Sequence, residues 1–421
     1  MTQSIAIIGG GAGGIFAALG ASNAAKEKGA ILDIHLFERN PRLGIKILIS
    51  GGGKCNITHE GKVDDVLKEG FPHTNEHRFL KHALYRYTNL DVLQLLECHG
   101  VHWHARENGR IFPNSGRAED VLGAFEGELR AANIFVHSKS RITSIHYADY
   151  CWHLLADGVE YRTDAVILAT GGTSYRKVGT TGDGLDYAAQ LGHTIVPVRA
   201  ALAPIYLKHP PEQECIGIAL RSAQLYVMRG DTILSKSSGD ILLTHKGLSG
   251  PATLDISRDA TLCLEDSPIH MKGNLLGNDR ENVLQQLISG QQSRAQQQVK
   301  TWLEEMLPNR FVPYVFDQAE IPLDRKWHAL TREERARLLA ALTRFDFGEV
   351  SEIPIDRGEV TAGGVNLKEV DPKTMMSQLA KGLFFAGEML DIAGEIGGYN
   401  LQAAYSTGWV AGEEAVKYLL A

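Results

Sequence analysis

The sequence lacks the features by which several large classes of protein are recognised. No apolar run reaches the roughly 18 residues that a membrane-spanning helix needs, and the apolar segment at 4–25 has no basic stretch before it, as a secretory signal would. The 43 Lys+Arg and 50 Asp+Glu residues give a formal net charge of -7, without long runs of one sign. We therefore expect neither a membrane nor a nucleic acid as a partner, because both attract positively charged surfaces.

Cysteine is also scarce. The five cysteines are odd in number, widely spaced and without a CxxC pair, at Cys55, Cys98, Cys151, Cys215 and Cys263. This pattern argues against a disulfide framework or a zinc site and fits a reducing cytoplasm. The histidine pairs 73/77 and 102/104 have no accompanying carboxylate motif. We therefore predict no metal site.

The clearest pattern that is present lies at the N-terminus. SIAII predicts a strand, IFAALGASNAAKEKG a helix and ILDIHLFE a second strand, which together make a β-α-β unit. Gly9, Gly11 and Gly14 form G-x-G-x-x-G between the first strand and the helix, and Glu38 ends the second strand. This spacing in this context is typical of a dinucleotide-binding turn.

Each residue of the turn has a physical role in that reading. Gly9 permits the tight turn, Gly11 lets a pyrophosphate approach the backbone at the helix N-terminus, and Gly14 lets the helix pack on the sheet. Glu38 accepts hydrogen bonds from a ribose diol, which suits FAD or NAD better than NADP. The competing interpretation is a glycine-rich turn followed by an ordinary surface glutamate.

The C-terminus separates FAD from NAD, because a flavin needs a second set of binding groups. In LFFAGEMLDIAGEIGGYNLQAAYSTG, Gly387 and Glu388 end a strand, and 397–400 immediately precede a helix. The acid can bind ribityl hydroxyls, and the N–H groups of the helix can meet the flavin edge where negative charge grows on reduction. A helix N-cap with a flexible turn remains the alternative.

A second glycine-rich stretch, LISGGGKCNITHE at 48–60, has no such ready explanation. It fails as a phosphate-cradling GxxxxGK[ST] loop, because Leu48 stands where the first glycine should be and Cys55 replaces the Ser/Thr. Some other ligand must approach this bare backbone.

The rest of the chain divides by its periodicity. Helical spacing predicts one helix over 77–100 and another over 117–133, and period-two alternation predicts a β-meander over 134–172 that returns to a buried strand. Short strands and turns follow 199, and helices fill 280–343, with Thr331 and Glu334 as a capping box. A strand at 381–388 and a closing helix at 400–421 complete the chain.

Five segments in order carry a resemblance over nearly the whole chain: GGGAGG, GIKILISGGGKCNITH, ILATGG, THKGLSGP and GLFFAGEMLDIAGEIGGYNLQAAYSTGWVAG. With them the sequence resembles the bacterial BaiN-type (YhiN-like) FAD-dependent flavoproteins. The resemblance implies an α/β fold, with a Rossmann-like FAD-binding domain of the glutathione-reductase type at 1–198 and 356–421. A β-barrel-like insert at 199–279 and 344–355 would interrupt it and carry a helical subdomain at 280–343.

The resemblance also extends the predicted cofactor site. It implies that the loop from Ser50 to Asn56 lies against FAD, that Lys46 and Lys54 offset its charge, that the backbone of Ile142 meets adenine, and that 170–172 form the second crossing. The full predicted set is Gly9, Gly11, Ala12, Gly13, Gly14, Glu38, Arg39, Lys46, Ser50, Gly51, Gly52, Gly53, Lys54, Cys55, Asn56, Ile142, Thr170, Gly171, Gly172, Gly387, Glu388, Gly397, Gly398, Tyr399, Asn400 and Leu401.

Three residues keep two interpretations each. Cys55 is either a redox partner of the flavin or a small packing residue, and packing is favoured because no second cysteine lies near it in sequence. His245 is either an acid or base of a lid or part of a self-stabilised turn. Arg110 binds a substrate carboxylate or pairs on the surface.

We therefore expect an FAD-dependent oxidoreductase that transfers a hydride or two electrons to or from a small organic substrate. The resembled family includes reducers of conjugated C=C bonds and amine oxidases, so it does not choose the substrate. No second G-x-G-x-x-G with strand and helix context occurs, so NAD(P)H is expected only as a transient co-substrate. An NAD-linked dehydrogenase without flavin and a flavin-dependent RNA-modifying protein are the alternatives, and the sequence does not decide between a monomer and a homodimer.

Overall fold

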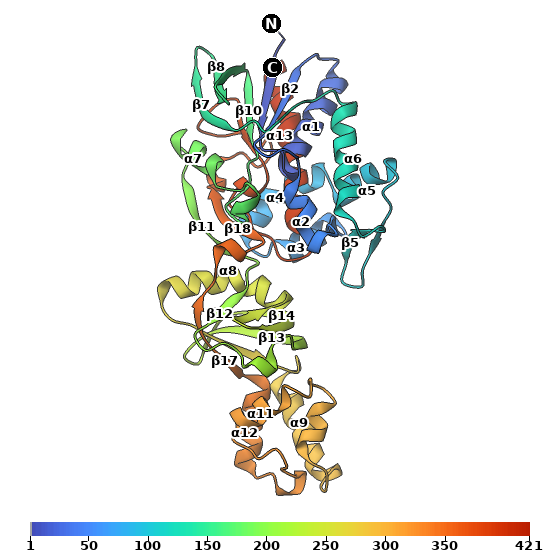
Figure 1. Ribbon diagram of the computed structural model, residues 1–421, viewed down its shortest axis with the longest axis vertical. Helices are drawn as coiled ribbons and strands as arrows, with labels where there is room; N and C mark the ends of the chain where they lie inside the picture. The colour runs from blue at the N-terminus through green and yellow to red at the C-terminus, as the bar shows by residue number, and fades with distance from the viewer. Residues whose placement is uncertain (1) are drawn as a thin grey trace. The chain divides into compact units, whose positions relative to one another are not determined.

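The structure is a computed structural model that describes residues 2–421, and it divides into two compact units (Figure 1). The discontinuous unit comprises the described residues up to Arg199 together with Val360–Ala421, and the inserted unit comprises Ala200–Glu359. The boundaries expected from the resemblance lie after 198 and after 355. Both crossings lie in strands or turns that join the two parts of the discontinuous unit to the insert.

A five-stranded parallel sheet forms the centre of the discontinuous unit. Its order is β19-β10-β1-β2-β6, with every neighbouring pair parallel. The strands are β1 (Ser4–Ile8), β2 (Asp33–Glu38), β6 (Phe135–Ser138), β10 (Ala165–Leu168) and β19 (Leu383–Phe385). The strands β1, β10 and β19 read SIAII, AVIL and LFF without alternation, because a parallel sheet is covered on both faces.

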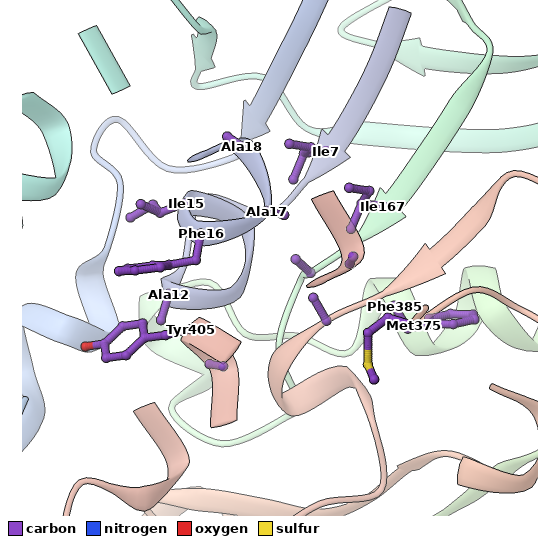
Figure 2. Close-up of a cluster of buried hydrophobic side chains, with 14 of the residues drawn as sticks. Ile7, Ala12, Ile15, Phe16, Ala17, Ala18, Ile167, Met375, Phe385 and Tyr405 are labelled. Carbon is purple, nitrogen blue, oxygen red and sulfur yellow. The ribbon is translucent and has the colours of Figure 1, made fainter. Parts of the chain in front are cut away.

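Two long helices pack closely against one another at this sheet, α1 (Ala12–Lys28) and α13 (Tyr399–Leu420). A Cβ at Gly408 would lie 2.2 Å from the Gly13 carbonyl oxygen, and one at Gly412 would lie 2.0 Å from that of Ala17. Only glycine allows the two backbones to approach this closely. Figure 2 shows Phe16 of α1 beside Tyr405 of α13, with ring centroids 4.4 Å apart.

The remaining elements of the discontinuous unit surround this centre. Helices and 3₁₀ turns are α2 (Ile45–Gly53), α3 (Val63–Gly70), α4 (Thr74–Arg86), α5 (Asn89–Cys98), α6 (Ala118–Ala131), η1 (Arg176–Val178), α7 (Asp183–Gln190), η5 (Leu367–Glu369) and η6 (Gly387–Met389). Small sheets are formed by β3 (Thr58–His59), β5 (Arg110–Pro113) and β4 (Trp103–Ala105), by β7 (Ile142–Ala148), β8 (Cys151–Ala156) and β9 (Val159–Thr163), and by β11 (Ile195–Ala201) with β18 (Val360–Val365).

Two of the expected elements are wrong in detail. The single helix expected over 77–100 is two helices, because Thr88 starts α5: its hydroxyl accepts from the Asp91 N–H, and the Asp91 carboxylate accepts from the Thr88 N–H. The segment 135–138 was expected in the meander, but β6 pairs in parallel with β2. That pairing depends on a partner about a hundred residues away in the chain, which local alternation cannot indicate.

The inserted unit is a closed barrel with helices. Its strand order is β12-β15-β14-β13-β16-β17, formed by β12 (Ile205–Leu207), β13 (Ala219–Arg229), β14 (Thr232–Thr244), β15 (Gly247–Ser249), β16 (His270–Asn274) and β17 (Phe345–Glu352). Its helices and 3₁₀ turns are η2 (Gln213–Cys215), α8 (Pro251–Asp266), α9 (Arg280–Ser293), α10 (Val299–Glu304), α11 (Val312–Ala319), η3 (Trp327–Ala329), α12 (Arg332–Thr343) and η4 (Ile355–Arg357).

The barrel and its helices share one hydrophobic core, which includes Leu225 of β13, Leu287 of α9 and Leu338 of α12. The capping box expected at Thr331 and Glu334 is confirmed, since each side chain accepts a hydrogen bond from the backbone of the other residue. Among residues 2–421, the structure contains no helix that is both long and apolar enough to cross a membrane.

Candidate cofactor site

The carboxyl ends of four neighbouring strands bring the predicted residues together. β1 leads into the Gly9 turn, β2 into Glu38, β10 into 169–172, and β19 into Gly387 and Glu388. The chain leaves β1 toward β2 on one side and returns to β10 on the other. Ligands bind at this kind of switch point in open parallel sheets.

The first turn has the geometry expected of a dinucleotide-binding loop. A Cβ at Gly14 would lie 1.8 Å from the Gly9 carbonyl oxygen, so that position must be glycine, whereas a Cβ at Gly11 would meet nothing within 4 Å. Gly11 is the N-cap of α1, which has no side-chain cap and no acid in its first turn. Ala12 and Gly13 form that first turn and are buried. The open space therefore lies at uncapped N–H groups that favour an anion.

Glu38 is buried beside this turn. Its two carboxylate oxygens accept the N–H groups of Gly10 at 2.8 Å and of Asn40 at 2.7 Å. Each oxygen retains a further acceptor position, because a carboxylate oxygen accepts two hydrogen bonds. Glu38 thus both fixes the turn and has the capacity to accept from a ribose diol.

The glycine-rich stretch at 50–56 turns back on itself at the end of α2. Gly51, Gly52 and Gly53 all adopt positive φ angles, of 57°, 68° and 84°. Cβ atoms at Gly52 and Gly53 would meet almost nothing, so this backbone is uncovered in the chain itself. Ser50 closes the loop through its carbonyl oxygen, which accepts the Cys55 N–H at 3.0 Å, and Lys54 is exposed.

Two residues after the glycines behave differently. Cys55 is completely buried, and burial raises the pKa of its thiol to about 12. A thiol that stays protonated is a poor nucleophile, which favours the packing role. Asn56 carries a buried side-chain oxygen that has no hydrogen-bond partner in the described chain. Such an orphaned acceptor calls for a donor from a ligand or water.

Glu388 lies at the centre of a network that joins three parts of the chain. Its carboxylate is 2.5 Å from the Lys46 ammonium of α2, and it accepts from the Ser174 hydroxyl at 3.2 Å and from the Thr361 N–H at 2.8 Å. Lys46 also donates to Ser174 at 2.9 Å. The network places an ion pair beside Gly172, whose Cβ would lie 3.1 Å from the carboxylate.

The N-terminus of α13 lies against β3. A Cβ at Gly398 would lie 2.6 Å from the Thr58 carbonyl carbon, and Thr58 donates to Gln402 at 2.7 Å. Gly398 is the N-cap, and the first turn of α13 has no acid and no side-chain cap. In this respect α13 is like α1, whose first turn also has no acid and no side-chain cap.

Side chains near this N-terminus make contacts within the chain itself. Tyr399 is buried, and its ring stacks on the imidazole of His59 with centroids 4.6 Å apart. The Asn400 amide accepts from the Gly394 N–H and donates to the Gly394 carbonyl, both at 2.8 Å. These residues therefore shape the loop, and Gly397 and the half-buried Leu401 lie on either side of them.

Four further predicted residues contact other parts of the discontinuous unit. The Ile142 carbonyl accepts from the Tyr187 hydroxyl at 2.6 Å, and the Thr170 hydroxyl contacts the Met389 sulfur. Arg39 donates to the Thr181 hydroxyl at 2.6 Å. Gly171 lies close to Glu388, since a Cβ there would be 3.9 Å from its carboxylate.

The two substrate-side candidates belong to different units. Arg110 starts β5, where it pairs with His59 of β3. His245 is exposed in the turn between β14 and β15 of the inserted unit. Only Arg110 is therefore in the same unit as the predicted cofactor residues.

Sequence reasoning missed Ser174, Thr361 and His59. Ser174 is the second residue after the ATGG turn, so its closeness in sequence was a usable signal. Thr361 gave none, because it reaches Glu388 from the start of β18. In the described residues no group of three His, Cys, Asp or Glu side chains has a geometry that could hold a metal ion.

These observations fit a flavin dinucleotide. The uncapped N-terminus of α1 follows β1 at the carboxyl edge of the sheet, and the same unit offers the uncapped N-terminus of α13, an uncovered glycine backbone and an orphaned Asn56 oxygen. Glu38 and Glu388 place acceptors at the ends of different strands, as two separate hydroxyl-bearing parts of a ligand would need.

Comparison with known proteins gives the family. The HI0933-like protein Rossmann domain matches residues 3–414. The ribosomal RNA dihydrouridine synthase of Haemophilus influenzae is 32% identical over 96% of this chain and 96% of its own. The 3-dehydro-bile acid delta(4,6)-reductase of Clostridium scindens is 28% identical over 98% of this chain and 99% of its own.

Among solved structures, a mutant FrdA subunit of the Escherichia coli quinol fumarate reductase has a TM-score of 0.52 and 17% identity, over 100% of this chain and 71% of that one. At this identity the likeness extends to the fold alone. The chain belongs to the HI0933-like Rossmann family.

Proposed function

We propose that this protein reduces a C=C bond conjugated to a carbonyl group in a small organic substrate. Bound FAD would supply the two-electron chemistry, and the chain would supply position, electrostatics and exclusion of water. The observation that carries the proposal is the pair of uncapped N-termini of α1 and α13, in a chain that is similar over 98% of its length to a protein named as a bile acid reductase.

The chain's own residues have distinct tasks in this proposal. The N–H groups at α1 favour a pyrophosphate, and those at α13 favour a site that becomes more negative on reduction. Glu388 would accept ribityl hydroxyls, while Lys46 holds that carboxylate in place and balances its charge. Arg110, in the same unit, is the candidate for binding a substrate oxygen or carboxylate.

The placement of Glu388 has a direct test. Glu388→Ala should lower the FAD content of the purified protein, because it removes the acceptor and leaves Lys46 without its partner. Glu107→Ala, which removes an exposed carboxylate from a loop of the same unit, is the control. Equal FAD content in the two variants would contradict the placement.

The reaction itself is tested anaerobically with the FAD-loaded protein. We expect NADH or NADPH to bleach the flavin absorbance and a 3-oxo-4-ene steroid to restore it, with one product molecule per flavin reoxidised. NAD(P)H would then be a transient donor. If the flavin stays oxidised with both nicotinamides but is bleached by an amine, the protein is an oxidase and the reductase proposal is wrong.

A second candidate substrate is a uracil base in ribosomal RNA. It is favoured by the 32% identical relative, which is named as a dihydrouridine synthase. Dihydrouridine is uridine with its ring double bond reduced, and that bond is also conjugated to a carbonyl. The net charge of -7 gives no electrostatic support for RNA, so the small molecule is the first choice.

One experiment distinguishes between the two candidate substrates. Reduced protein is mixed with the steroid, with unmodified ribosomal RNA, or with RNA in rising salt, and flavin reoxidation is followed. If RNA reoxidises the flavin and the steroid does not, and if salt weakens the reaction as phosphate contacts require, the substrate is ribosomal RNA and not the small molecule. Reoxidation by the steroid alone supports the small-molecule reductase.

A further inference from the structure

The β7-β8-β9 meander carries three reactive groups in a row. The Cys151 sulfur lies 3.4 Å from Nε2 of His153, and Nδ1 of His153 lies 2.6 Å from a carboxylate oxygen of Glu160. Cys151 and His153 are two apart on β8, so they share one face of the strand. Glu160 comes from β9, opposite Leu155.

The hydrogen bonds fix how the histidine is protonated. A hydrogen bond from His153 lowers the pKa of Glu160, which therefore stays a carboxylate and can only accept. Nδ1 of His153 must then donate its N–H to Glu160. In the neutral ring this leaves Nε2 as an acceptor, so the Cys151 thiol donates its proton to it. This order of thiol, imidazole and carboxylate is the one that activates a cysteine.

The three groups are separate from the cofactor site. Trp152, Leu154 and Ala156 alternate with them on β8 and belong to the core of the discontinuous unit. Cys151 is half-buried, so solutes reach it, whereas His153 is only 5% exposed and is covered by the stacked ring of His146. Arg162, opposite His153, also lies 3.7 Å from Glu160 and keeps that carboxylate charged.

We propose that Cys151, His153 and Glu160 form a relay that makes Cys151 a site of covalent modification by hydrogen peroxide. A metal site is not an alternative, because the described residues contain no suitable group of ligands. A buried structural cysteine would be chemically inert, and Cys55 provides that contrast within the same chain.

The chemical step is balanced as follows. His153 takes the thiol proton, and the thiolate attacks one oxygen of hydrogen peroxide. An S–O bond forms as the O–O bond breaks, so sulfur is oxidised by two electrons to a sulfenic acid and the peroxide is reduced. The departing hydroxide takes the proton back from His153 and leaves as water.

The test measures thiol reactivity in the FAD-loaded, full-length protein. Iodoacetamide labelling at pH 6.5, read peptide by peptide by mass spectrometry, compares Cys151 with Cys98, which is exposed and has no histidine hydrogen bond in residues 2–421. A free cysteine has about 1% thiolate at this pH. We expect Cys151 to react about tenfold faster than Cys98, and peroxide with a sulfenic-acid trap to label Cys151 first.

Variants separate the relay from mere exposure. Glu160→Gln removes an exposed partner whose loss the fold should tolerate, and it should slow labelling of Cys151 severalfold without changing that of Cys98. His153→Gln should slow it further. Asp157→Asn makes the same change of charge in the β8-β9 turn and should have no effect.

Two results would overturn the proposal. One is a Cys151 rate no greater than that of Cys98 in the unaltered protein. The other is an unchanged Cys151 rate in Glu160→Gln with the melting temperature and FAD spectrum preserved. Because the cofactor site is not involved, either result would leave the proposed reductase function untouched.

Discussion

The helices of this protein begin in two different ways. α5, α9 and α12 start at Thr88, Asp279 and Thr331, whose side chains accept a backbone N–H of the first turn. α1 and α13 start at Gly11 and Gly398, which have no side chain to offer. A side-chain cap contributes about 1 kcal/mol, so the helices of the cofactor edge forgo local stability and leave their N–H groups available. A missing side-chain cap is not confined to these two helices, since α8 of the inserted unit begins at Gly250 without one, and what distinguishes α1 is the open space at Gly11.

The largest effect should come from closing the glycine turn itself. In Gly14→Ala the new Cβ would lie 1.8 Å from the Gly9 carbonyl oxygen, so α1 must move from the sheet at a cost of about 3 kcal/mol or more. We expect little soluble FAD-loaded protein, measured by calorimetry and flavin absorbance. Gly123→Ala in α6, where a Cβ meets nothing, is the control. A normal melting temperature and FAD content in Gly14→Ala would disprove the close packing.

The second largest effect should come from a contact in the body of α13, far from its N-terminus, and it should change stability but not FAD binding. Arg86 of α4 donates two hydrogen bonds, each 2.7 Å long, to the buried carboxylate of Glu413. We expect Arg86→Met to lower the free energy of unfolding by about 2 kcal/mol at pH 7, without weakening FAD binding. Urea unfolding and FAD titration measure the two quantities. If the free energy of FAD binding fell as much as the free energy of unfolding, the body of α13 would contribute to FAD binding as well as to stability.

The same pair has a pH dependence with a definite sign. Burial would raise the pKa of Glu413, but hydrogen bonds from Arg86 and Lys417 outweigh it and lower the pKa below the ordinary 4.5. A lowered folded-state pKa stabilises the protein above the ordinary pKa, and this stabilisation is lost as the pH falls through the folded value. The difference between wild type and Arg86→Met should therefore shrink below pH 4.5.

A smaller effect should appear where the helix start is open. Gly11 has φ −80°, which alanine adopts without strain, and its Cβ would enter empty space. We expect Gly11→Ala to keep the stability of the apoprotein but to weaken FAD about tenfold, or 1.4 kcal/mol, since the methyl would meet the pyrophosphate. Fluorescence titration with FAD measures it. Unchanged affinity would place the phosphates elsewhere.

The smallest effect should come from a capped helix. Thr331→Ala removes the cap of α12 and should cost about 1 kcal/mol of stability while FAD affinity stays the same. The matched change Thr88→Ala should do the same at α5. Chemical unfolding measures the stability and titration measures the FAD affinity. A change in FAD affinity in either variant would show that capped helices also contribute to binding.

Local patterns were enough for much of the site. The Gly9 turn and Glu38 follow from a strand, a turn and a helix that are contiguous in sequence, and the structure joins them through the Gly10 N–H. The capping box of α12 was likewise readable from Thr331 and Glu334. The similar box at Thr88 and Asp91 was present in the sequence, but the apolar spacing on both sides of it suggested one continuous helix.

What the sequence by itself determined is the chemistry available: glycines at the first turn, an acid at the end of each of two strands, and a helix without a capping side chain at the C-terminus. Only the tertiary structure decided which of these groups meet. Lys46 and Glu388 are 342 residues apart, and Gly398 meets Thr58 across a similar separation. Such contacts depend on the order in which parallel strands assemble, and that order is set by the packing of the whole sheet, which no local pattern encodes.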